Sequence, residues 1–105
     1  MVRPVTILIA GTLTIDPSKV DAALADAAVM MKASQAEDGC HAYAFSADPI
    51  NAGTLLLFEK WDSEEALAAH SASAHMKEFQ SKMPGWGVTG ADIKKYEVAS
   101  EGPLR

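Results

Sequence analysis

The chain has 105 residues, which is the size of a single domain. Hydrophobic residues make up 49% of it and charged residues 22%, a balance typical of globular rather than disordered proteins. The net charge is -5, and the sequence has no stripe of basic residues that could neutralise phosphates, which argues against a nucleic-acid partner. A domain this small encloses little interior space, so we expect a sizeable pocket to need help from a partner chain.

The opening segment from Met1 to Ile15 contains a short apolar run that is interrupted by threonines and a glycine. Such a run predicts neither a membrane span nor a signal peptide, and we expect no membrane partner. Cys40 is the single cysteine, so no internal disulfide is expected and nothing indicates an oxidising compartment. The expected location is therefore cytoplasmic.

The first half of the chain predicts a strand, a helix and a second strand. Apolar and small residues from Val5 to Ile15 indicate a long strand, in which Gly11 suggests a bulge or the close approach of another group. Asp16-Pro17 indicates a helix start, and the helix ends before Gly39. Its expected apolar stripe is Val20, Leu24, Ala27, Ala28 and Met31. Alternation over Cys40–Ala47 then predicts a strand with His41, Tyr43 and Phe45 on one face.

The second half predicts a hairpin, a broken helix and an edge strand. Turn-forming residues from Asp48 to Gly53 lead into the strand Thr54–Trp61. A capping box with Asp62 as the cap begins a helix, which we expect to break within residues 71–74. Residues 84–87 close the second piece, and a polar strand over residues 88–98 suits a sheet edge.

This order of elements predicts an α+β, ferredoxin-like βαββαβ fold with an antiparallel sheet and helices on one face. The other face would carry Leu8, Ala10, Leu56 and Phe58, which are apolar and need cover. Two sheets packed face to face would bury them, so we expect a homodimer. Residues 99–105 have no periodicity and form a tail.

Candidate catalytic groups cluster late in the sequence. Glu59 shares a strand face with Trp61, and His70 falls on the sheet-facing side of the following helix. In an unbroken helix His70 and His75 would lie about 140° apart, so their cooperation depends on the break. An imidazole with a carboxylate behind it is typical of proton abstraction. The structural alternatives are a core histidine bonded to a carbonyl or to Glu59, and a tryptophan that only fills the core.

The other motifs predict little further chemistry. Histidines five residues apart do not share one helical face, and there is no cysteine pair, so no metal site is expected. Phosphate loops and nucleophile motifs are also absent from the sequence. The remaining candidates for contact with a substrate are His41, Tyr43, Trp61 and Phe79.

Three segments, EDGCHAY from Glu37, FEKWDSEEALAAH from Phe58 and SASAHMKEF from Ser71, closely resemble the antibiotic biosynthesis monooxygenase family. The resemblance extends from Val5 to Val98 and is closest to the bacterial quinol monooxygenases, so residues 1–98 are expected to form one such domain. It implies a dimeric α+β barrel that binds a flat quinol-like or polyphenolic aromatic and oxidises it with dioxygen, without flavin, metal or other cofactor.

On this resemblance His70 or His75 would remove the phenolic proton and Glu59 would orient an imidazole. Trp61, Tyr43 and Phe79 would enclose the ring. The asparagine and tryptophan of haem-degrading relatives have no match here, which disfavours haem breakdown. Two alternatives stay open, an isomerase that shuttles protons on a small signal molecule and a non-catalytic, small-molecule-binding stress-response dimer.

Overall fold

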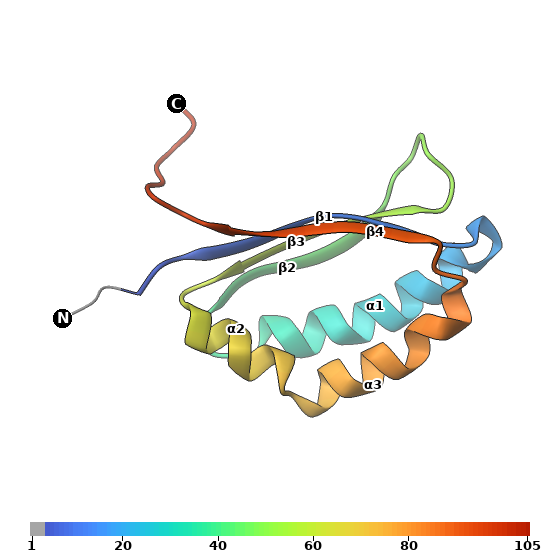
Figure 1. The fold of residues 1–105 in the computed structure, drawn as a ribbon, viewed down its shortest axis with the longest axis horizontal. Helices are drawn as coiled ribbons and strands as arrows, with labels where there is room; N and C mark the ends of the chain where they lie inside the picture. Colours follow the sequence, from blue (N-terminus) through green and yellow to red (C-terminus); the bar gives the residue numbers. More distant parts are fainter. Residues whose placement is uncertain (1–3) are drawn as a thin grey trace.

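The computed structural model describes residues 4–105 as one curved sheet with all helices against the same face (Figure 1). The elements are β1 (Ile7–Thr14), the 3-10 helix η1 (Pro17–Lys19), α1 (Val20–Gln35), β2 (Cys40–Ala47), β3 (Thr54–Trp61), α2 (Glu64–Ser71), α3 (Ala74–Lys82), the 3-10 helix η2 (Met83–Trp86) and β4 (Gly90–Glu97). The strand order is β2-β3-β1-β4, and all neighbouring strands are antiparallel. This arrangement confirms the predicted α+β, ferredoxin-like fold.

The first and last strands of the chain, β1 and β4, follow the prediction with shorter bounds. β4 lies at the sheet edge and all eight of its residues are exposed, as its polar sequence indicates. β1 and β4 each begin two residues later than expected and end one residue earlier. None of the helices within residues 4–105 is long and apolar enough to cross a membrane.

The core lies between the sheet and the helices. Alternation along β1 and β3 directs one row of side chains to the helices, and these are buried: Ile7, Leu13, Leu55, Leu57 and Trp61. The row that α1 buries is Ala23, Ala27, Met30 and Ser34. The predicted stripe was therefore wrong at Ala28, which is exposed. The buried residues follow one another at intervals of four, three and four along the helix, and Ala28 does not lie on that row.

The region after β3 forms two short helices rather than one. Ser63 caps α2 by accepting a hydrogen bond from the amide of Ala66 at 3.1 Å, so the prediction of Asp62 as the cap was wrong by one residue. The predicted break is confirmed at Ala72 and Ser73, between α2 and α3. The Ser73 hydroxyl accepts from the amide of Met76 at 3.2 Å and donates to the carbonyl of His70 at 2.7 Å.

The sheet face opposite the helices is apolar at its centre. Leu56 and Phe58 are exposed there on β3. Their register partners on β1 are Thr12 and Ala10, and Leu8 lies beside Lys60. The four apolar residues expected on this face therefore do lie on it, and no described residue of the same protomer covers Leu56 or Phe58 fully.

Gly11 in β1 lies where two strands approach closely, as the sequence suggested. A Cβ at this position would lie 2.0 Å from the carbonyl oxygen of Asp92 and 2.7 Å from the Cα of Ile93, both in β4. No side-chain rotation can relieve such a contact because both atoms belong to the backbone.

We predict that Gly11→Ala lowers the free energy of unfolding by roughly 1–3 kcal/mol, because the methyl group forces β4 away from β1. Gly90→Ala is the matched control, since a Cβ there meets open space. It should change stability by no more than about 0.5 kcal/mol. Urea denaturation of the two variants measures the difference, and equal stabilities would contradict this account of Gly11.

Candidate active site

The break between α2 and α3 brings two histidine rings to one carboxylate. Nδ1 of His70 lies 2.8 Å from Oε1 of Glu37, and Nε2 of His75 also contacts this oxygen. The two ring centroids are 5.9 Å apart. The expected convergence of the two histidines is therefore present, but their carboxylate partner is Glu37 rather than Glu59.

Glu37 is held by the turn that joins α1 to β2. Its amide donates to the carbonyl of Ser34 at 3.0 Å, and its carbonyl accepts from the amide of Cys40 at 3.2 Å. Gly39 in this turn has a φ of 81°, and its carbonyl accepts from the amide of Asp62 at 2.8 Å. The turn is thus tied to the end of β3, which fixes the direction from which the carboxylate reaches the histidines.

His70 is packed among aromatic rings. Its ring centroid lies 4.7 Å from that of Trp61 and 5.3 Å from that of Tyr43, and only 3% of its side chain is exposed. Nδ1 is the ring nitrogen that contacts Glu37, so Nε2 is the ring atom left to face a ligand. The hydroxyl of Tyr43 is the second polar group of this aromatic setting.

Glu59 has a different partner from the one expected. It is buried on the helix-facing side of β3, and one of its oxygens accepts a hydrogen bond from the indole nitrogen of Trp61 at 2.9 Å. Burial raises the pKa of the Glu59 carboxyl, against the opposing effect of the Trp61 hydrogen bond. This carboxyl thus fixes the Trp61 ring, and Glu37 has the position behind the imidazole that the sequence assigned to Glu59.

Neither Tyr43 nor Cys40 is suited to act as a base or nucleophile. Burial, reinforced by the charge of Glu59, raises the pKa of the Tyr43 hydroxyl far above its usual range. Burial also raises the pKa of the Cys40 thiol, with the charge of Glu37 adding to the effect. Tyr43 can therefore donate a hydrogen bond at neutral pH, and proton abstraction is left to the histidines.

His41 does not join this cluster. β2 has an irregular register between Cys40 and Ala42 against β3, so His41 falls out of the alternation that would have placed it beside Tyr43. Its ring is about half exposed and pairs with Asp62 at the surface. The expected grouping of His41 with the other candidates was wrong for this reason. Phe79 is buried and lies beyond Phe45, which separates it from Tyr43; the ring centroids of Phe79 and Phe45 are 5.6 Å apart.

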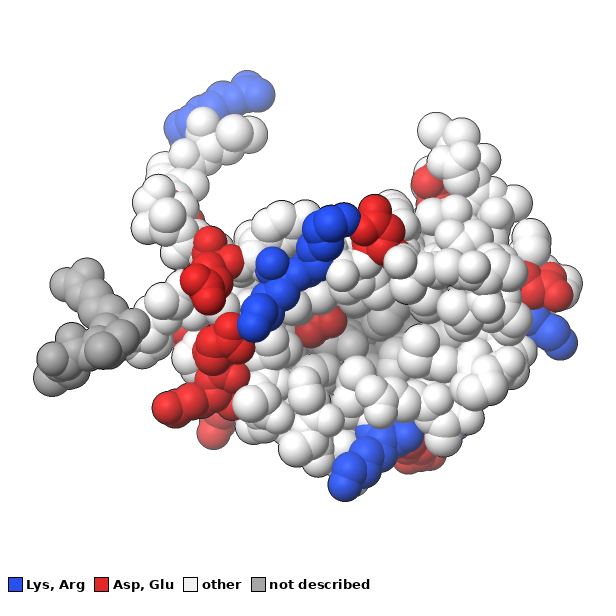
Figure 2. Space-filling view, in the orientation of Figure 1, with Lys and Arg blue, Asp and Glu red and all other residues white. Residues whose placement is uncertain are grey.

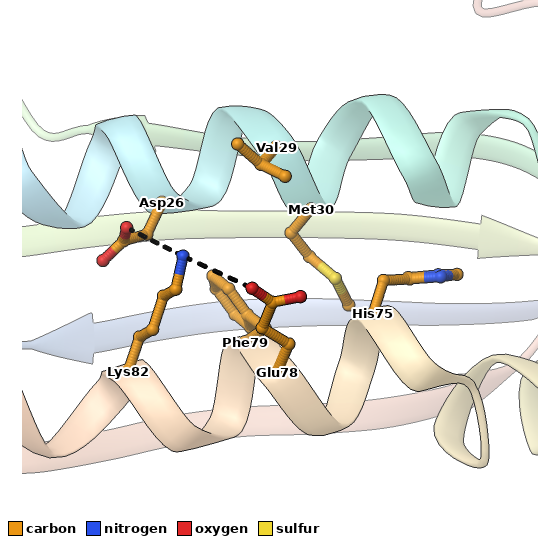
Figure 3. Close-up of a pocket in the computed structure, with 7 residues that line it drawn as sticks. All are labelled: Asp26, Val29, Met30, His75, Glu78, Phe79 and Lys82. Atoms are coloured by element: carbon orange, nitrogen blue, oxygen red, sulfur yellow. Dashed lines mark ion pairs between the residues drawn. The ribbon is translucent and has the colours of Figure 1, made fainter.

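A small pocket opens between α1 and α3, with a cavity volume of about 30 Å³ (Figure 3). Its lining residues are Asp26, Val29, Met30, His75, Glu78, Phe79 and Lys82. Lys82 reaches across it toward Asp26 and Glu78, at 3.7 and 3.8 Å, and His75 lies at its other end. The volume suits one water molecule and is too small for an aromatic ring.

A second depression lies on the other side of the helices. Figure 2 shows the surface hollowed between β4 and the helices that pack under the sheet. The residues of β4 are exposed, and Lys95 bridges the strand to α2 through its ion pair with Glu64 at 2.7 Å. The helices therefore leave part of the sheet uncovered on their own side.

The sequence patterns did not predict a role for Glu37, although it begins one of the three segments that resemble the family. Glu37 lies 33 residues before His70 and 38 before His75, outside any helical or strand periodicity. The only local signal was an acidic pair, Glu37-Asp38, directly before Gly39 in a turn. Such a signal indicates a turn and carries no information about its partners.

Several known proteins share this architecture. A Deinococcus radiodurans structure, provisionally assigned to the antibiotic biosynthesis monooxygenases, matches with a TM-score of 0.85 at 24% identity over 94% of this chain and 98% of its own. Rv0793 from Mycobacterium tuberculosis matches with a TM-score of 0.82 at 22% identity over 93% of this chain and 99% of its own. At these identities the likeness shows the fold alone.

Two relatives are similar in sequence. The uncharacterised protein sll1783 of Synechocystis sp. is 31% identical over 89% of this chain, and the match spans only 63% of that longer protein. YcnE of Bacillus subtilis, provisionally named a monooxygenase, is 28% identical over 89% of this chain and 98% of its own length. The family model for the antibiotic biosynthesis monooxygenases matches residues 6–82. The fold and this match together show that the chain belongs to the antibiotic biosynthesis monooxygenase family.

Proposed function

We propose that this protein is a cofactor-independent monooxygenase that oxidises a quinol or related polyphenol with dioxygen. The observation that carries the proposal is the buried His70, which packs against Trp61 and contacts the Glu37 carboxylate through Nδ1. Membership of the family and the provisional monooxygenase name of YcnE support it.

In the proposed mechanism a substrate hydroxyl binds between the Tyr43 hydroxyl and Nε2 of His70. His70 accepts the phenolic proton at Nε2, and the Glu37 carboxylate stabilises the resulting imidazolium through its contact with Nδ1. Tyr43 donates a hydrogen bond to the phenolate oxygen. His75 holds the other side of Glu37 and so acts as a positioning residue.

The reaction is balanced without an external reductant. The phenolate transfers an electron to dioxygen, and the substrate radical then combines with the reduced oxygen to form a C–O bond. One oxygen atom stays in the product and the other leaves as water, so a quinol and dioxygen give a hydroxylated quinone and water. The substrate supplies all four electrons, and the aromatic walls of Trp61 and Tyr43 keep water from the intermediates.

A homodimer is part of this proposal. The pocket between α1 and α3 is too small for a quinol, which leaves the hollow beside β4 as the entrance. Leu56 and Phe58 are exposed at the centre of the free sheet face, where a second copy can bury them.

We predict that the wild-type protein consumes dioxygen with menadiol in an oxygen electrode, after correction for autoxidation. His70→Ala should reduce this uptake by about 100-fold or more, because the general base is lost. Glu37→Gln should reduce it as well, and His41→Ala should not, since His41 lies at the surface. Uptake by Glu37→Gln and His70→Ala equal to that of the wild type would contradict the proposal, and menadiol binding without uptake would favour a binding protein.

We predict a particle of twice the 11.1 kDa chain mass in size-exclusion chromatography with light scattering. Phe58→Glu should shift it toward the monomer, because it places a charge in the centre of the apolar face. Ile50→Glu is the matched control, since Ile50 is exposed in the loop between β2 and β3. A wild-type monomer, or a Phe58→Glu dimer as stable as the control, would rule out this interface.

We predict a pH-dependent gain in stability for Glu59→Gln. The folded state holds the Glu59 proton to a higher pH than the unfolded chain, because burial raises the pKa of this carboxyl. The wild type therefore loses stability as the pH rises through the unfolded and then the folded pKa. The free energy of unfolding of Glu59→Gln relative to the wild type should therefore rise as the pH increases above the ordinary carboxyl pKa of about 4.5.

Glu97→Gln provides the control for this comparison, because Glu97 is exposed at the end of β4. Its stability relative to the wild type should change little over the same pH range. Urea denaturation at each pH measures both variants. A difference between Glu59→Gln and the wild type that stays constant or falls with rising pH would contradict a raised Glu59 pKa.

A further inference from the structure

We propose that Glu37, His70 and His75 form a binding site for one divalent transition-metal ion. Oε1 of Glu37, Nδ1 of His70 and Nε2 of His75 are the three potential ligand atoms. Each residue contributes one of them, and the three atoms all lie within 4.8 Å of one another. No other such group of three histidine, cysteine or acidic residues occurs in the part of the chain that the structure describes.

The donor set selects the class of metal. Two neutral imidazole nitrogens and one carboxylate oxygen suit Zn²⁺, Co²⁺ and Fe²⁺, whereas Mg²⁺ and Ca²⁺ prefer sites made of oxygen atoms. Three protein ligands also leave at least one coordination position for water or another small molecule. The site is therefore expected to discriminate strongly between Zn²⁺ and Mg²⁺.

The distances between the three ligand atoms are close to those between ligand atoms that bind one metal ion. With metal–ligand bonds of about 2.0–2.1 Å, neighbouring ligand atoms lie roughly 3.0–3.4 Å apart. Nδ1 of His70 and Oε1 of Glu37 are 2.8 Å apart, so a small outward rotation of side chains makes room for the ion. The carboxylate that now contacts both rings would then bind the metal between them.

Two of the three ligands are already held in place. The His70 ring packs against Trp61 and Tyr43, and the turn that carries Glu37 is bonded to Ser34 and to the end of β3. Groups that fix the orientation of the ligands in this way raise metal affinity. His75 is the most accessible ligand, with 28% of its side chain exposed against 17% for Glu37 and 3% for His70, so the ion enters from its side.

Occupation of the site has a consequence for the proposed reaction, and this part of the inference rests on the proposed function. A neutral imidazole that binds a metal through Nδ1 carries its remaining proton on Nε2. Nε2 of His70 then has no free electron pair with which to accept the phenolic proton. Metal binding would therefore inhibit quinol oxidation rather than support it.

Binding is tested first with the metal alone. We expect apo protein to bind one equivalent of Zn²⁺ per chain in isothermal titration calorimetry, and Mg²⁺ not to compete. Titration with Co²⁺ should produce visible absorption bands, which report nitrogen and oxygen ligands directly. Failure of the wild type to bind either Zn²⁺ or Co²⁺ would overturn the proposal and leave the cluster a hydrogen-bonded one only.

Three variants locate the site. His75→Ala and Glu37→Gln should each weaken Zn²⁺ binding by more than about 100-fold, because loss of a ligand costs more than loss of an outer-shell partner. Both side chains are partly exposed, so the variants should fold, which circular dichroism checks. His41→Ala is the matched control and should bind Zn²⁺ as the wild type does. Loss of binding in His41→Ala alone would instead place the ion at the surface pair of His41 and Asp62.

The inhibition is tested separately from the binding. We expect Zn²⁺ to suppress oxygen uptake with menadiol in the wild type, and EDTA to restore it. Zn²⁺ binding without any oxygen uptake by the apo protein would refute the proposed function and leave the metal site intact. Tight Zn²⁺ binding with unchanged uptake would refute the inhibition, since His70 would still act as a base.

Discussion

The candidate site depends on one carboxylate, that of Glu37, which contacts the rings of both His70 and His75. The three groups come from separate places in the fold: the turn after α1, the last turn of α2 and the first turn of α3. A buried histidine needs a partner for its ring nitrogens, and Glu37 provides one for His70 where no periodic element could. Removal of this carboxylate would take away the hydrogen-bond partner of Nδ1 in the buried His70.

The protomer has reactive groups but little room for a substrate. Trp61 and His70 are almost fully buried, and the pocket beside His75 has a cavity volume of about 30 Å³. A chain of 105 residues buries a smaller share of its surface than a larger domain and so encloses little interior space beyond its core. The sheet has open surface on both sides: Leu56 and Phe58 are exposed on the face opposite the helices, and the hollow beside β4 lies on the helix side.

Periodicity was sufficient to predict the fold and part of the site. Alternation along Thr54–Trp61 places Glu59 and Trp61 on one face, and the structure confirms that both are buried there. The break after Ser71 was also predictable, because a serine that can cap a helix follows it.

The remaining features depend on contacts that the local pattern does not contain. Glu37 contacts His70 across 33 residues of chain, and its position is set by a turn in which the carbonyl of Gly39 accepts a hydrogen bond from the amide of Asp62. The irregular register of β2 moves His41 out of its alternation, and only pairing with β3 reveals it. The shift of the helix cap from Asp62 to Ser63 is a smaller error of the same kind, since both residue types are good caps.

The Ser73 hydroxyl ends one helix and begins the next with the same oxygen atom. It donates to the carbonyl of His70 and accepts from the amide of Met76, so a single hydroxyl group fixes the angle between the two histidine-bearing helices. Aspartate could replace only the accepting half of this arrangement, and alanine neither half. The joint between α2 and α3 therefore needs a side chain whose single oxygen atom can both donate and accept a hydrogen bond.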